Sequence, residues 1–326
     1  MRIAFVGKGG SGKTSLSVLY SHFVGALGNR VVLVDADLNL HAGSLLSPDF
    51  VFPSELYLSQ PKVMQEIRTY LRGKNHRITD LSAFVKTTPP TSDSNFIHLD
   101  NINDPIVQKF SIPLVGLRLM TVGTYDSAAL GTSCYHNNLG IFENILSHTI
   151  DESAWLIADM VAGIDAFANT LYTQFDLVVL VVEPTRRGVE VVKQFLHLAE
   201  CGEILETLVV VGNKIRTPND DSFLRREIPS ELYLGSFIFS DYMLTVDQSK
   251  IPLESNMIED PNRCLLSLIH DRINSQSSRQ IQRMTMLHDL HRRYVAQSYI
   301  SERFGDLSNQ IDPNLDLSSN RRLYEL

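Results

Sequence analysis

The octapeptide Gly7-Lys8-Gly9-Gly10-Ser11-Gly12-Lys13-Thr14 lies between an apolar run, residues 3–6, and a segment with the composition of a helix, residues 15–27. It matches G-x-x-x-x-G-K-[ST] at a strand-to-helix junction, which is the pattern of the phosphate-binding P-loop. Glycines allow successive backbone N–H groups to curve around phosphate oxygens, and the N-terminus of the next helix adds partial positive charge. The stretch therefore predicts an α/β protein that binds a nucleotide.

Each polar residue of this loop has an expected role. The loop and Ser15, which follows it, would bind the nucleotide phosphates. Lys13 would reach the β- and γ-phosphates, and the Thr14 hydroxyl would bind Mg²⁺. The alternative is a glycine-rich turn that matches the motif by chance, but the apolar strand before it and the helix after it favour the P-loop.

Lys8 is a second lysine inside the loop, which gives G-K-G-G-x-G-K-T. This sequence resembles the deviant Walker A motif of the MinD/ParA/NifH/ArsA (SIMIBI) class of ATPases. In that class the early lysine crosses a dimer interface to the partner's nucleotide, so the resemblance implies a homodimer formed on ATP binding. The alternative for Lys8 is a surface lysine exposed to solvent.

Size and composition are those of an ordinary globular protein. The 326 residues are 44% hydrophobic and 20% charged, and the formal net charge of -8 excludes a polycation built for nucleic acid. Three scattered cysteines suggest a reducing compartment rather than a disulfide framework. The sequence begins with a strand, without a signal peptide, and its aliphatic runs are far shorter than the ~20 residues of a membrane span. We therefore expect a cytoplasmic protein without a transmembrane segment.

Two carboxylates follow the second predicted strand, residues 30–34, in the sequence Asp35-Ala36-Asp37. Carboxylates just past the carboxyl end of a central strand lie where open α/β sheets bind ligands. In the resembled class, D-x-D at this place is the first switch. The resemblance implies that Asp37 orients the attacking water, which makes it catalytic together with Lys8 and Lys13, and that Asp35 belongs to the Mg²⁺ shell. The alternative is that Asp35 caps the following turn.

A third carboxylate, Asp159, ends the apolar strand of residues 155–159. This is the Walker B pattern, in which the aspartate orders Mg²⁺, usually through water. Residues 159–163 would form the second switch, with the backbone of Gly163 as a γ-phosphate sensor that is released on hydrolysis.

The expected preference for one nucleotide base depends on the residues at and just after the end of a later strand, residues 208–213. Asn213 occupies the position at which the resembled class reads adenine with its amide. The GTPase motif N-K-x-D would require Asp at position 216, where this chain has Arg216, so we expect ATP rather than GTP. After a last strand, residues 232–239, the stretch 239–253 resembles the base-flanking loop of the class.

Alternating strands and helices predict a doubly wound, mostly parallel sheet with right-handed crossovers. We expect a P-loop ATPase domain over residues 1–260, with an insertion at about 46–115 that contains a helix at 61–72. Residues 261–326 would form a C-terminal helical extension with helices at 263–273 and 276–304 and a frayed polar tail from 305. Residues 263–303 carry seven arginines against three carboxylates. These arginines are either a solvated face or an anion-binding arm.

Within the class, the chain resembles the CooC-type ATPases, nickel-insertion factors for carbon monoxide dehydrogenase, over residues 1–46 and 116–253. The resemblance is carried by the P-loop and by residues 34–37, 116–123, 157–163, 183–187 and 211–214. That family has a Cys-x-Cys pair whose two copies meet in the dimer to bind a metal, but here the first cysteine is replaced by Thr132. Cys134 and His136 on one side of an extended segment could still form a Cys₂His₂ site across the dimer. The alternative is a packed thiol and a surface histidine.

Three functions remain open. The first is a dimeric ATPase that uses ATP/ADP and Mg²⁺ as a switch to mature or load a client protein. The second is a ParA- or MinD-type positioning ATPase that acts on DNA or membrane. The acidic net charge and the short final segment, residues 320–326, weigh against it. The third is a nucleotide-binding scaffold without hydrolysis, against which the presence of Lys13, Thr14, Asp37 and Asp159 weighs.

Overall fold

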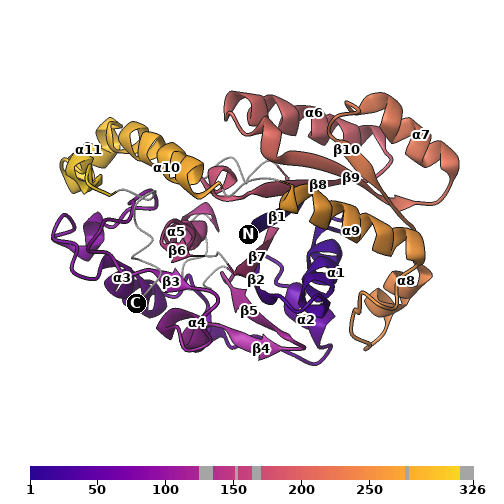
Figure 1. Cartoon of the computed structure of the whole chain (residues 1–326), viewed down its shortest axis with the longest axis horizontal. Coiled ribbons are helices and arrows are strands. Elements are labelled where there is room, and N and C mark those ends of the chain that lie inside the picture. The colour runs from indigo at the N-terminus through magenta and orange to yellow at the C-terminus, as the bar shows by residue number, and fades with distance from the viewer. Residues whose placement is uncertain (125–134, 151–152, 164–169, 276–278, 316–326) are drawn as a thin grey trace.

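The computed structural model describes residues 1–124, 135–150, 153–163, 170–275 and 279–315, and helices cover both faces of a central sheet (Figure 1). Within these residues the sheet has eight strands in the order β10-β9-β8-β1-β7-β2-β5-β4. All neighbouring strands run parallel except β4 and β5. The strands of this sheet are β1 (Arg2–Gly7), β2 (Arg30–Ala36), β4 (Ile112–Leu114), β5 (Leu117–Thr121), β7 (Ala154–Met160), β8 (Leu177–Val182), β9 (Leu208–Ile215) and β10 (Tyr233–Ile238). The predicted doubly wound, mostly parallel sheet is confirmed.

Alternation along each buried strand explains the two helical layers. In β1, Ile3 and Phe5 pack on one face of the sheet with α1, α2 and α9, while Ala4 and Val6 pack on the other face with α3, α5 and α6. Successive side chains of a strand point to opposite faces, so a strand that is apolar at every position needs cover on both sides. The helices are α1 (Lys13–Ala26), α2 (Ala42–Leu46), α3 (Pro61–Arg72), α4 (Pro105–Phe110), α5 (Tyr135–Ser147), α6 (Arg186–Cys201), α7 (Pro218–Glu227), α8 (Asp241–Gln248), α9 (Asp260–Asn274), α10 (Gln280–Val295) and α11 (Ser298–Phe304).

The inserted segment, residues 46–115, packs against the face that carries α5. Helix α3 has the predicted bounds, with Val63, Ile67 and Leu71 buried in the core cluster that includes α5. The segment also pairs β3 (Ile97–His98) with β6 (Thr149–Ile150). At the end of the insertion the structure has a strand that the sequence analysis did not predict. There β4 adds an antiparallel edge strand to β5 through Val115 and Gly116, whose positive φ angles of 43° and 80° fit a tight hairpin turn.

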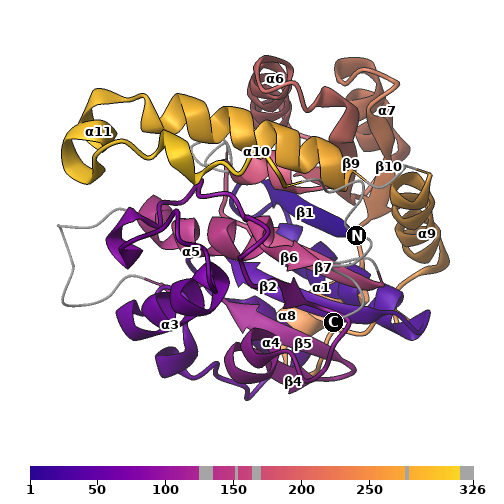
Figure 2. The same ribbon diagram turned by 60° about the vertical axis from the view of Figure 1, so that its left-hand side comes forward.

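The C-terminal helices differ from the prediction in number and position. Helix α9 buries Leu265, Leu266, Ile269 and Ile273 against the sheet face that carries α1. The single helix expected over 276–304 is two helices in the described residues, α10 and α11, which are separated at Ala296 and Gln297. Figure 2 shows α10 lying along the outside of the α5 layer and reaching the insertion.

Residues 279–315, which we call the C-terminal arm, tie the insertion to the sheet. At its start, Arg283 forms a buried ion pair with Asp176, and Arg279 contacts Glu206 at 2.9 Å. At its end, Gln310 accepts a hydrogen bond from Thr88 Oγ1 (2.9 Å) and donates one to the carbonyl of Ala83 (2.8 Å).

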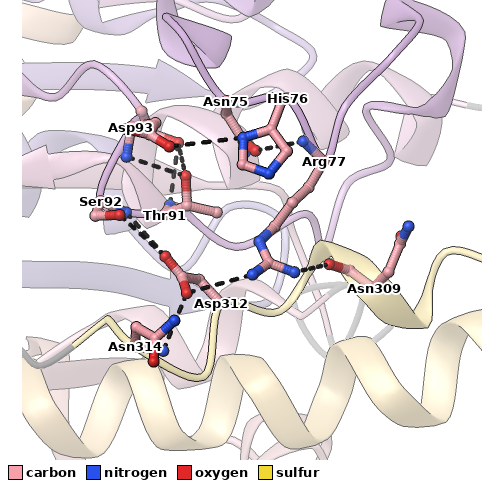
Figure 3. Close-up of polar contacts among 10 residues, drawn as sticks. Asn75, His76, Arg77, Thr91, Ser92, Asp93, Asn309, Asp312 and Asn314 are labelled. Carbon is pink, nitrogen blue, oxygen red and sulfur yellow. Dashed lines mark hydrogen bonds and ion pairs between the residues drawn. The ribbon is translucent and has the colours of Figure 1, made fainter.

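A polar cluster completes this junction (Figure 3). Asp312 accepts hydrogen bonds from the backbone N–H and hydroxyl of Ser92 and lies 3.6 Å from the guanidinium of Arg77. Arg77 also donates to the carbonyl of Asn309 at 2.9 Å. The tail expected to fray from residue 305 is therefore docked as far as 315, because its polar side chains find partners on the insertion.

None of the helices in the described part of the chain has the length and apolar composition needed to cross a bilayer.

We expect the stability of the fold to depend on pH because the carboxyl group of Glu143 is buried. Glu143 on α5 is 2% exposed. Its Oε2 accepts a hydrogen bond from the hydroxyl of Thr170, and its Oε1 has no hydrogen-bond partner among the residues that the structure describes. Burial raises its pKa to about 7, although Lys86 and the Thr170 bond oppose the shift. Below pH 4.5 the protonated carboxyl therefore makes its full contribution to the stability of the folded state. As the pH rises through about 7, this contribution is lost.

We expect Glu143→Gln to unfold at higher urea concentration than the wild type at pH 8, with a gain of up to about 3 kcal/mol, and with no gain at pH 4.5. The amide keeps the shape and one acceptor but never has to be ionised in the core. Urea unfolding of both proteins at the two pH values measures the difference. An equal difference at both pH values would show that Glu143 does not titrate in this range.

Candidate functional site

The P-loop connects β1 to α1 at the carboxyl edge of the sheet. Gly10 and Gly12 have positive φ angles of 82° and 96°, a conformation that residues with a Cβ rarely adopt. A Cβ on Gly12 would lie 2.2 Å from Nδ2 of Asn213, so the loop also requires glycine for space. Asn213 Nδ2 donates to the carbonyl of Ser11 at 2.7 Å, which fixes the loop to the end of β9.

Lys13, at the start of α1, is buried beside two of the predicted acidic residues. Its amine forms an ion pair with Oδ2 of Asp37 and lies 3.7 Å from Oδ1 of Asp159. Burial alone would lower the pKa of Lys13, but the charges of Asp159 and Asp37 outweigh it and raise the pKa above the ordinary value. The structure thus brings together three residues that lie far apart in the sequence.

Asp35 and Asp159 are direct neighbours on β2 and β7. Burial, and then the charge of Asp159, raises the pKa of Asp35 well above its ordinary value, and burial raises the pKa of Asp159 to about 6 despite the opposing charge of Lys13. For Asp37, burial is outweighed by Lys13, which lowers the pKa. Three buried carboxylates thus lie around one ammonium group, which leaves an excess of negative charge at this place.

The residues fit a magnesium ion at Asp159. Both carboxylate oxygens of Asp159 are buried, and within the described residues neither has a hydrogen bond of normal geometry, although the Thr14 hydroxyl and the Lys13 amine lie nearby. Such groups are costly to leave unpaired. Thr14, in the first turn of α1, lines the cleft beside the P-loop that is described below. Carboxylate and hydroxyl oxygens are the hard ligands that Mg²⁺ takes, usually with several waters.

Asp35 was predicted to belong to the Mg²⁺ shell, but both of its carboxylate oxygens accept backbone hydrogen bonds. Its Oδ1 accepts the backbone N–H of Asp37 at 3.2 Å, and its Oδ2 accepts that of Ala42 at 3.0 Å. These bonds correspond to the alternative in which Asp35 caps the turn after β2. A role in the Mg²⁺ shell stays a prediction.

The second switch contacts the P-loop, and Lys8 lies within the loop. The N–H of Gly163 donates to the carbonyl of Gly7 at 2.9 Å, which joins the two segments directly. Lys8 is exposed and forms no ion pair in the part of the chain that is described. The predicted γ-phosphate sensor therefore contacts the phosphate loop, and Lys8 is accessible to another molecule.

A cleft of about 810 Å³ extends from the P-loop to β10 and α8. Its lining includes Thr14, Asp37, Asn213 and the pair formed by Arg216 and Phe239, in which the guanidinium lies 3.9 Å from the ring centroid. The stretch expected as a base-flanking loop at 239–253 instead contains α8, which Ser240 caps by accepting the N–H of Met243 at 3.1 Å. Asn213 also lines the cleft, and its role in reading adenine stays a prediction.

One site residue had no role in the sequence analysis. Lys214 has a positive φ of 61°, and its amine contacts the carbonyl of Gly10 (2.6 Å) and Oε1 of Glu183 (2.8 Å). It therefore supports the P-loop from β9, alongside Asn213. The available signal was the lysine directly after Asn213, but the sequence alone gave no reason to expect its side chain to point towards the P-loop.

The described residues include only part of the transition-metal site expected at Cys134 and His136. Cys134 lies outside the described residues, and His136 lies in the first turn of α5. The backbone at His136 is therefore helical rather than extended as expected. Among the described residues, no cluster of three or more His, Cys, Asp or Glu side chains could hold a metal ion.

Comparison with known proteins agrees with this geometry. No protein-family model matches the chain. The chain is similar to the carbon monoxide dehydrogenase accessory protein CooC of Rhodospirillum rubrum, with 25% identity over 277 residues that cover 84% of this chain and 97% of the relative. It is also similar to an uncharacterised ATP-binding protein of Methanocaldococcus jannaschii, with 27% identity over 233 residues, or 71% of this chain and 80% of the relative.

Solved structures show the same arrangement of strands and helices. A ParA family ATPase from Chlorobium tepidum has a TM-score of 0.55 and 14% identity, over 84% of this chain and 97% of its own. An ATP complex of Cyanothece McdA has a TM-score of 0.53 and 13% identity, over 85% of this chain and 97% of its own. At these identities the likeness establishes the fold alone.

Proposed function

We propose that the chain is a P-loop ATPase of the MinD/ParA (SIMIBI) class, as its similarity to CooC suggests. It would be a slow, Mg²⁺-dependent, dimeric ATPase that matures or loads a client protein in the cytoplasm. The observation that carries the proposal is the contact of Lys13, which lines the cleft together with Asp37, with both Asp37 and the fully buried Asp159. A scaffold without hydrolysis would not need Asp37 at this place.

In the proposed reaction, the oxygen of a water molecule bonds to the γ-phosphorus of ATP, and the bond to the β–γ bridging oxygen breaks. ADP leaves with the electron pair, and the water's proton ends on the released phosphate. Asp37 accepts a hydrogen bond from the water and orients it, while Lys13 and the P-loop N–H groups stabilise the phosphate charge. Thr14 and Asp159 would hold Mg²⁺, which would neutralise further phosphate charge.

A DNA-positioning function is less well supported. Of the seven arginines in residues 263–303, four form ion pairs within the chain and two others donate to backbone carbonyls. Arginines with internal partners contribute little to phosphate binding along DNA. The CooC relative is an accessory protein of carbon monoxide dehydrogenase, which instead favours a protein client. The insertion and the C-terminal arm would recognise this client.

The proposal is tested by incubating the purified chain with Mg²⁺ and ATP, measuring ADP, and repeating the assay with EDTA and with GTP. We expect ADP only when Mg²⁺ is present, and slower or absent turnover of GTP. Size-exclusion chromatography of the apo, ADP and non-hydrolysable ATP forms, followed by metal analysis of each peak, tests the dimer and any bound transition metal. Hydrolysis that is insensitive to EDTA would contradict the proposed chemistry.

A further inference from the structure

Asp37 has different partners on its two carboxylate oxygens. Oδ2 forms the ion pair with Lys13. Oδ1 accepts two hydrogen bonds from one residue, Asn39, through its backbone N–H and its side-chain Nδ2, both at 2.9 Å. Asp37 is buried, whereas Asn39 is exposed and lines the nucleotide cleft.

These two sets of contacts differ in how ATP would affect them. The phosphates of ATP attract the amine of Lys13, so Oδ2 of Asp37 loses its partner when the nucleotide binds. The bonds from Asn39 involve no group that the nucleotide needs. In the bound state Asn39 is therefore the contact that keeps the carboxylate of Asp37 in one orientation.

The backbone around Asn39 is held independently of its side chain. Asp35 accepts the N–H groups of Asp37 and Ala42, and the carbonyl of Asp37 accepts the N–H of Leu40 at 3.4 Å. Replacing Asn39 therefore removes one donor to Asp37 and leaves the turn in place.

We propose that Asn39 is a positioning residue for the hydrolysis. It holds Oδ1 of Asp37 so that Oδ2, which Lys13 occupies in this structure, faces the attacking water once ATP has drawn Lys13 away. The inference rests on the proposed ATPase function. Catalytic groups must be held within a fraction of an ångström of the productive geometry, so the loss of one charge-assisted bond lowers the rate rather than the affinity.

We expect Asn39→Ala to lower kcat by about 10- to 100-fold with an unchanged KM and unchanged affinity for a non-hydrolysable ATP analogue. Asn39→Asp has the same shape but replaces the donor by a second carboxylate, so kcat falls at least as far. Asn39→Gln keeps the amide donor and recovers part of the loss. Asn95→Ala is the matched control, because Asn95 Nδ2 donates to the carbonyl of Tyr70 (2.9 Å) away from the cleft.

The outcomes distinguish this inference from the function on which it rests. A wild type without Mg²⁺-dependent ADP production overturns both. A wild type that turns over ATP while Asn39→Ala keeps its kcat overturns the inference alone. A parallel loss of kcat and of analogue binding in Asn39→Ala would make Asn39 a nucleotide-binding residue, which also overturns the positioning role.

Discussion

Lys13→Ala loses ATP binding by at least about 100-fold, whereas Asp37→Ala binds ATP and loses turnover by about 10²- to 10⁴-fold. Lys13 is placed to contact phosphates that are present before the reaction, so its loss weakens the ground-state complex. Asp37 is placed to orient the water, so its loss acts on the transition state. The two residues form one ion pair in the structure, yet removing Lys13 is expected to weaken binding and removing Asp37 is expected to slow turnover.

Equilibrium binding of a fluorescent ATP analogue and ADP production under single-turnover conditions separate the two effects. Because Lys13→Ala leaves Asp37 and Asp159 without their ammonium partner, its stability must be measured as well. Lys13→Arg keeps the charge and serves as the second variant if Lys13→Ala is unfolded. Equal loss of ATP binding in the Lys13 and Asp37 variants would refute the assigned roles.

Lys8→Ala binds ATP but stays monomeric and loses about 10³-fold or more in turnover. Within its own loop Lys8 is redundant with Lys13, and it is exposed without an ion-pair partner in the described residues. Supplied across a two-fold interface, its charge would stabilise the partner's phosphates as an arginine finger does in trans. ATP, but not ADP, is therefore expected to produce the dimer.

Size-exclusion chromatography with light scattering, in the presence of a non-hydrolysable ATP analogue, measures the dimer directly. Lys62→Ala is the matched control, since Lys62 is also exposed but lies on α3. A Lys8→Ala protein that dimerises and hydrolyses like the wild type would leave Lys8 as a surface charge without a role in the switch.

The sequence by itself determined the parts of this protein that depend on local patterns. Glycines at fixed spacing predicted the P-loop, and runs of apolar residues predicted the central strands. Asp35 and Asp37 were expected at the edge of the sheet where such folds bind ligands, and Asp159 was expected as the Walker B aspartate. The bounds of α3 followed from Pro61 at its start and Gly73 at its end.

Only the tertiary structure decided which partners these residues take. Asp35 uses both oxygens on backbone N–H groups, Asn213 donates to the P-loop, and Lys214 reaches Gly10, because each group takes the donor or acceptor that the folded chain brings within 3.2 Å. The docking of the C-terminal arm on the insertion could not be predicted from the sequence either. Its contacts join residues about 200 or more positions apart, and periodicity reports only on neighbours along the chain.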